Sequence, residues 1–193
     1  MHGVLCRNPS LYYYQGFHDV CLLFLLVLGE TKAFVVSERV GQFYLRDAMS
    51  QTLSPVVELL ALIYPLVKLE DPALYAFLEG AGSKPFYSLS WVITWFAHDI
   101  SKRETVERIF DFLISSDPLM PVYLSAAFIL EQRDQILAQE QDGDVIHGFM
   151  SSQLRHHSHT FDFDHLILIA DRLHRLHPPS SLQQSTHITL SPE

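Results

Sequence analysis

The sequence predicts an all-α protein, and three observations carry that prediction. At three places a capping side chain stands directly before a proline, which is typical of a helix start because the first helical residue needs no hydrogen-bond donor. No segment alternates apolar and polar residues for long enough to indicate a strand. Hydrophobic residues make up 48% of the 193 residues and charged residues 18%, a composition that favours a packed core over disorder.

The helices of the N-terminal half are expected at residues 15–28, 31–45, 55–69 and 72–80. The first of these contains the apolar run Val20 to Leu28. The third and fourth follow Ser54-Pro55 and Asp71-Pro72, whose serine and aspartate side chains are expected to cap them. Pro65 lies inside the third segment and should kink that helix or end it early.

The helices of the C-terminal half are expected at residues 87–98, 118–139, 144–153 and 164–176, with one more after a capping box at 101–104. Trp91, Trp95 and Phe96 fall in the first of these, and we assign them to the core because aromatic residues at helical spacing are usually buried. Asp117-Pro118 marks the start of the segment 118–139.

The chain is expected to hold one domain over residues 1–178 and a disordered tail over 179–193. Beyond Pro178-Pro179 the composition shifts to serine, glutamine and threonine, which bury too little apolar surface to fold. The polar segment 155–160 is expected to be a surface loop.

The acidic charge balance argues against a nucleic-acid partner. Thirteen basic and 22 acidic residues give a net charge of −9, whereas phosphate binding needs clustered lysine and arginine. Cys6 and Cys21 supply neither a disulfide framework nor a CxxC metal pair. No signal peptide is evident, and the longest apolar run is far shorter than the ~20 residues that span a bilayer. We therefore expect a cytoplasmic chain without a transmembrane segment.

The candidate site lies in the run Tyr13-Tyr14-Gln15-Gly16-Phe17-His18-Asp19-Val20. A polar cluster directly before an apolar helix places the Gln15 amide at the edge of a rigid element, which suits a recognition or catalytic group. This amide both donates and accepts hydrogen bonds, so it can orient an attacking water. Gly16 has no side chain and lets another backbone approach closely. The residues alone also allow an ordinary helix start with interfacial tyrosines.

An alternative interpretation of the sequence is that its histidines bind a metal ion. His18-Asp19 and His98-Asp99 are dipeptides of the kind that HD-type metal phosphohydrolases use, and those enzymes are all-helical. With 11 histidines such pairs arise readily by chance, and the second group of histidines, around 156–159, lacks a cysteine or paired carboxylates. We expect no metal and no cofactor. No Gly-rich phosphate loop is present, so any nucleotide belongs to a partner.

The tetrapeptide Tyr13-Tyr14-Gln15-Gly16 resembles the Y-x-Q-G motif of the TBC domain, the all-helical module that activates Rab GTPases. Further blocks in the same order are similar to TBC counterparts, namely Asn8-Pro9 and residues 89–96, 108–112 and 118–123. Together they are most similar to the branch of the family that resides at the endoplasmic reticulum. The resemblance covers residues 5–178 and implies a multi-helix orthogonal array, of which this chain would form the C-terminal two-thirds.

The resemblance implies a GTP-bound Rab-family GTPase as the partner and vesicle traffic, between endoplasmic reticulum and Golgi, as the process. TBC domains supply a glutamine from Y-x-Q and an arginine from I-x-x-D-x-x-R. Gln15 would be the catalytic residue, with Tyr13 and Gly16 as its motif partners. Asp19 is expected to support the loop by hydrogen bonding.

The catalytic arginine of the family has no counterpart here. Arg7 is the only arginine among the 14 residues before Gln15, and it lacks the motif context. Residues 114–120 fit the motif except that Met120 replaces the arginine, and they lie on the wrong side of Gln15. An arginine finger is worth about 10³–10⁵ in rate. The sequence thus predicts a Rab-activating domain without its arginine. The alternative is a non-catalytic Rab-binding helical module, and an HD-type phosphohydrolase is a distant third.

Overall fold

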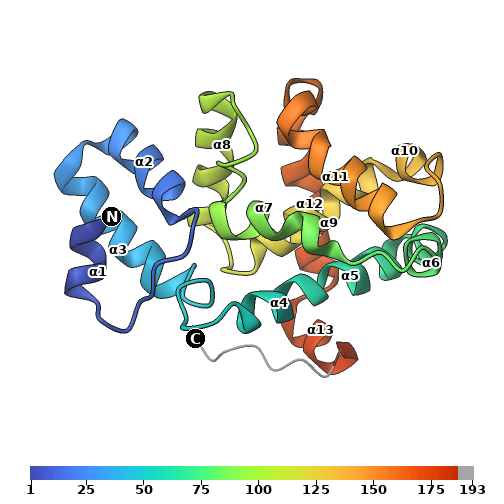
Figure 1. Ribbon diagram of the computed structural model, residues 1–193, viewed down its shortest axis with the longest axis horizontal. Helices are drawn as coiled ribbons and strands as arrows, with labels where there is room; N and C mark the ends of the chain where they lie inside the picture. Colours follow the sequence, from blue (N-terminus) through green and yellow to red (C-terminus); the bar gives the residue numbers. More distant parts are fainter. Residues whose placement is uncertain (187–193) are drawn as a thin grey trace.

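The computed structural model describes residues 1–186, and these fold entirely into helices and their connections, without a strand (Figure 1). The elements are α1 (His2–Arg7), α2 (Phe17–Leu28), α3 (Glu30–Phe43), α4 (Ser54–Ala61), α5 (Ile63–Glu70), α6 (Pro72–Gly80), η1 (Pro85–Ser88), α7 (Leu89–Thr94), α8 (Arg103–Ile114), α9 (Met120–Glu131), α10 (Arg133–Leu137), α11 (Gly143–His157), η2 (Ser158–Thr160), α12 (Phe163–Leu176) and α13 (Pro179–Thr186). The all-α prediction is confirmed.

Helix α9 is the centre of the fold. Every residue from Met120 to Ile129 is buried, which matches a sequence that is apolar on all sides of the helix. It packs against α12, α5 and α7, while α1, α2 and α3 lie together at one end of the molecule and α6 and α10 at the other (Figure 1). The long axis of the protein therefore runs from the α1–α3 group through α9 to α6.

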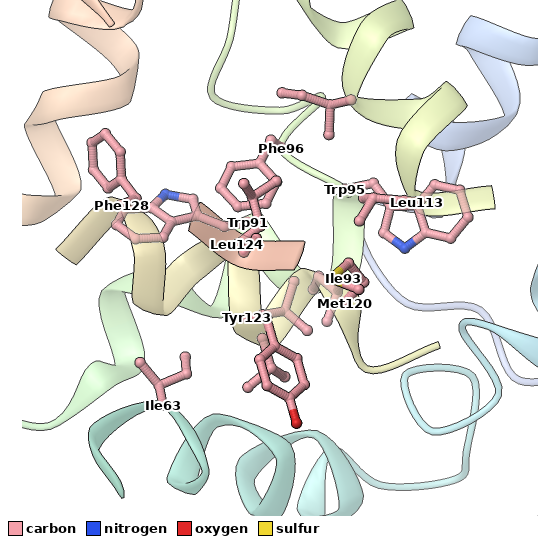
Figure 2. Packing of buried hydrophobic residues seen from close by; sticks show 14 of the residues in the cluster. Ile63, Trp91, Ile93, Trp95, Phe96, Leu113, Met120, Tyr123, Leu124 and Phe128 are labelled. Carbon is pink, nitrogen blue, oxygen red and sulfur yellow. The ribbon is translucent and has the colours of Figure 1, made fainter. Parts of the chain in front are cut away.

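The aromatic residues assigned to the core are buried as predicted. The Trp91 ring stacks on Phe96 and meets Phe128 edge-on, with the ring centroids 5.2 Å apart in the second pair (Figure 2). Trp95 contacts Phe110 of α8 at 5.1 Å. These contacts join α7, α8 and α9 into one core.

Two of the predicted helices are divided in the structure. The segment 55–69 becomes α4 and α5, and α4 ends at Ala61 because the Pro65 ring would clash with the carbonyl four residues before it. Pro65 then falls in the first turn of α5, where a missing N–H is tolerated. The segment 118–139 becomes α9 and α10, with Gln132 between them. The prediction for Pro65 is confirmed, whereas that of one continuous helix over 118–139 is wrong.

Two predicted caps do not form. Helix α4 begins at Ser54 itself, so Leu53 is the N-cap, and α8 begins at Arg103 with Lys102 as its cap and no side-chain cap bond. The Asp71 cap is confirmed, because its carboxylate accepts a hydrogen bond from the Leu74 N–H at 2.9 Å.

Two segments predicted to be irregular are helical. Residues 155–160 continue α11 to His157 and then form η2, because the buried side chains of Leu154 and Ser158 hold this end against the core. The predicted tail begins with α13, whose Leu182 is buried and which packs against α5. The prediction of a disordered tail therefore does not hold for residues 179–186, and its remainder, 187–193, lies outside the described residues.

Candidate functional site

Gln15 lies in a turn directly before α2, at the edge of the α1–α3 group. Its side chain is exposed, whereas Tyr14, Gly16 and Phe17 around it are buried. Among residues 1–186, no hydrogen bond engages the Gln15 amide. The chain thus presents the Gln15 amide to solvent from between three packed residues.

Tyr14 fixes the turn on its N-terminal side. Its hydroxyl donates a hydrogen bond to the carbonyl oxygen of Ile93 in α7, and its ring lies 5.9 Å from that of Phe17. Burial, more than any neighbouring charge, raises the pKa of the Tyr14 phenol well above its ordinary value. The hydroxyl therefore stays protonated and keeps its role as a donor.

Gly16 fixes the turn on its C-terminal side. Its φ is +124°, a conformation that residues with a side chain rarely adopt, and a Cβ at this position would lie 2.7 Å from Cγ2 of Thr94. Thr94 is itself held, since its Oγ1 donates to the Ser90 carbonyl at 2.6 Å. Gln15 is thus bracketed by two residues that rest on the end of α7.

The end of α7 has an unusual backbone. Trp95 and Phe96 both have positive φ, 53° and 66°, although both are large and buried. Each costs roughly 1–2 kcal/mol in this left-handed conformation, and this cost is offset by the burial of two aromatic rings. The turn ends the helix at Thr94 rather than His98, so the prediction of a helix over 87–98 is wrong there. It also directs the following residues back toward α2.

A chain of two hydrogen bonds and one ion-pair contact runs across the surface beside Gln15. The Tyr13 hydroxyl lies 3.1 Å from Nδ1 of His18, and Nε2 of His18 lies 3.3 Å from Oδ1 of Asp19. The other carboxylate oxygen, Oδ2, lies 3.0 Å from Nδ1 of His98. We call these four residues the Tyr13–His98 network. It joins both sides of the Gln15 turn to the segment after α7.

The predicted site residues therefore come together, though not all in the predicted way. Asp19 contacts the Gln15 turn through its backbone, with its N–H donating to the Gly16 carbonyl at 2.9 Å, while its side chain binds two histidines. Sequence reasoning missed Ile93, Thr94 and His98 as parts of the site. Only His98 carried a signal, because it stood in the second His-Asp dipeptide.

The histidines considered as metal ligands are used differently. Among residues 1–186, no three histidine, cysteine, aspartate or glutamate side chains are arranged to hold a metal ion. The second dipeptide is divided between two partners, because Asp99 binds Nε of Arg155 at 2.8 Å whereas His98 binds Asp19. The His156 and His157 rings lie 6.4 Å apart on α11, and the His147 ring faces Tyr87.

A comparison of the sequence with family models and a comparison with individual proteins identify the same family. The family model of the Rab-GTPase-TBC domain matches residues 2–137. The chain is 35% identical over 179 residues to "TBC1 domain family member 20" of Bos taurus and of Homo sapiens, an alignment that covers 93% of this chain and 43% of either relative. It is 41% identical over 150 residues to "GTPase-activating protein gyp10" of Schizosaccharomyces pombe, covering 76% of this chain and 40% of that protein. The chain thus spans less than half the length of these relatives.

Proposed function

The chain belongs to the Rab-GTPase-TBC domain family, and we propose from this premise that it acts on a GTP-bound Rab-family GTPase through Gln15. One observation supports the choice of residue above the others. Gln15 is exposed in a turn whose neighbours Tyr14 and Gly16 are both packed on α7. The backbone on both sides of Gln15 is held in this way, so the point from which its amide projects stays fixed when a partner binds, which is what catalysis requires of a positioned group.

The chemistry assigned to Gln15 is the orientation of water. Hydrolysis of GTP needs a water placed in line with the γ-phosphate, and a glutamine orients it by accepting from the water while donating to a second group. The proposal assigns the nucleotide to the Rab. Hydrolysis would end the active state of the Rab in vesicle transport between endoplasmic reticulum and Golgi.

The place of action in this proposal is the cytoplasm, at endoplasmic reticulum or Golgi membranes, and its support is the sequence resemblance alone. Among residues 1–186, no helix combines the length and apolar character that a membrane crossing requires. Imaging of the tagged chain beside markers for both organelles tests the location. A uniform distribution through the cell would contradict it.

The activity is tested by single-turnover GTP hydrolysis with a panel of GTP-loaded Rab proteins. The chain is compared with Gln15→Ala and with Gln135→Ala, which removes an exposed glutamine from α10 at the other end of the molecule. Because the sequence holds no counterpart of the family's arginine, the stimulation should be weak; we expect it for at least one Rab with the chain and with Gln135→Ala, and its loss in Gln15→Ala. Equal stimulation by Gln15→Ala would overturn the role of this residue.

A second candidate is a non-catalytic module that binds a Rab without accelerating hydrolysis. The observation that favours it concerns Arg7, the only arginine before Gln15 in the sequence. The Arg7 guanidinium pairs with Glu38 of α3, Nε to Oε1 at 3.3 Å. Affinities for Rab loaded with GTP, GDP and GDP–aluminium fluoride separate the two candidates. Preference for the transition-state mimic supports catalysis, and equal affinities support the module.

A further inference from the structure

We propose that His98 is a positioning residue for Gln15 and that it acts through Asp19. The inference rests on the proposed function of Gln15. It assigns a role to a histidine that lies 79 residues from Asp19 in the sequence and outside the Y-x-Q-G motif. The Tyr13–His98 network is the structural basis of this role.

The network closes the Gln15 turn from outside. Tyr13 precedes Gln15 by two residues and His18 follows it by three, so the Tyr13–His18 contact joins the two sides of the turn. Asp19 continues the connection to His98 with its second carboxylate oxygen. To open or shift, the turn must break the contact across it or pull α2 away from the segment after α7.

The Asp19 carboxylate fixes the direction of the hydrogen bond between Asp19 and His98. A carboxylate only accepts, so His98 donates from Nδ1, whereas Nε2 of His18 lies beside the other carboxylate oxygen as an ion-pair contact at 3.3 Å. The Tyr13 hydroxyl and Nδ1 of His18, 3.1 Å apart, form the second hydrogen bond of the network. Each oxygen of Asp19 contacts one histidine, and an amide at position 19 would lose one of these two acceptors.

The histidines of the network are half exposed, so they can position the turn locally without contributing much to the overall stability of the protein. The side chains of His18 and His98 are about half exposed, at 50% and 49%, and polar contacts of such groups contribute little to global stability. The buried bond of Tyr14 and the packing of Gly16 hold α2 to α7 in any case. Loss of His98 should therefore loosen the turn while the fold remains intact.

The test uses amide hydrogen exchange of the free chain, measured by NMR at Phe17 and Asp19. Both N–H groups are hydrogen-bonded within the turn, to the Tyr14 and Gly16 carbonyls. We compare His98→Ala and His98→Asn, since an asparagine amide places an N–H donor near the position of Nδ1. His159→Ala, an exposed histidine on η2, is the control.

We expect His98→Ala to speed exchange at Phe17 and Asp19 by roughly two- to tenfold, which corresponds to one hydrogen bond of ordinary net strength. His98→Asn should restore slow exchange, and His159→Ala should leave it unchanged. Unchanged exchange in His98→Ala would overturn the proposal. The exchange result does not depend on any Rab, so it distinguishes a failed network from a failed proposed function.

Where a Rab responds to the chain, the same variants are assayed for stimulated hydrolysis. His98→Ala should lower the rate constant at saturating chain by a similar factor while leaving the affinity for the Rab unchanged, with recovery in His98→Asn. A full rate constant in His98→Ala, despite faster exchange, would show that the turn need not be fixed and would also overturn the proposal.

Discussion

The hydroxyl oxygen of Tyr14 lies 2.5 Å from the carbonyl oxygen of Ile93, and this buried hydrogen bond connects the Gln15 turn to the centre of the molecule. Tyr14→Phe removes the donor and leaves a buried carbonyl without it. We expect the free energy of unfolding to fall by about 1–3 kcal/mol, measured by urea denaturation. Tyr13→Phe, at an exposed tyrosine, should change it by no more than about 0.5 kcal/mol. Equal effects of the two variants would contradict this assignment.

Gly16→Ala is expected to destabilise the protein by at least about 1–3 kcal/mol, because it combines an unfavourable backbone conformation with a contact against Thr94. Gly148→Ala is the matched control. That glycine lies within α11, and no atom is close to the position of an added Cβ. Alanine should therefore raise the free energy of unfolding of the protein by roughly 0.5–1 kcal/mol. Thermal unfolding of both variants checks the opposite signs. A neutral Gly16→Ala would show that the turn relaxes freely.

Trp91→Ala should cost about 3–5 kcal/mol, because it removes a fully buried ring between Phe96 and Phe128 (Figure 2). Trp91→Phe should cost clearly less. It retains much of the packing and removes an indole N–H that has no hydrogen-bond partner among residues 1–186. Denaturant unfolding of the two variants gives the comparison, and a larger loss for phenylalanine than for alanine would contradict it.

Acidification should weaken the contact between α5 and α12. Glu70 accepts hydrogen bonds from Arg172 at 2.6 Å and from His177 at 2.9 Å. Burial by itself would raise the pKa of Glu70, but these hydrogen bonds outweigh it and hold the pKa below its ordinary value. The folded pKa is lower than the unfolded one, so the stabilisation is present above the unfolded value of about 4.3 and is lost as the pH falls through the folded pKa.

Urea denaturation of the wild-type chain and of Glu70→Gln between pH 3 and 6 tests this sign. The stability advantage of the wild type should shrink toward the acid end. Glu140→Gln, at an exposed carboxylate after α10, controls for removing a charge. An advantage that grows on acidification would reverse the assignment.

The apolar face of α2 should promote self-association of the chain. Leu22, Leu25 and Leu26 are 51%, 47% and 59% exposed, and the first two also line a groove of about 580 Å³ beside α3. Contiguous apolar surface of this kind favours association. The double variant Leu22→Gln/Leu26→Gln should sediment as a monomer at concentrations where the wild type associates. Leu168→Gln, at an isolated exposed leucine of α12, should leave association unchanged.

Several features of this protein are local and could be read from the sequence. Helix α6 begins where Asp71-Pro72 predicts, because an aspartate cap and a following proline act on the first turn alone. Helix α4 ends as Pro65 requires, since the clash of the proline ring involves only the preceding turn. The position of Gln15 before α2 likewise follows from neighbouring residues.

Other features were decided only by contacts between distant segments. Trp95 and Phe96 take a left-handed conformation that local preference opposes, because burying both rings offsets its cost. α13 forms in a polar segment because Leu182 finds a buried place in the fold. His98 meets Asp19 across 79 residues, and nothing in either local sequence specifies the other. A sequence pattern reports interactions within a few turns of the chain, whereas the energy of burial depends on which surfaces the whole fold brings together.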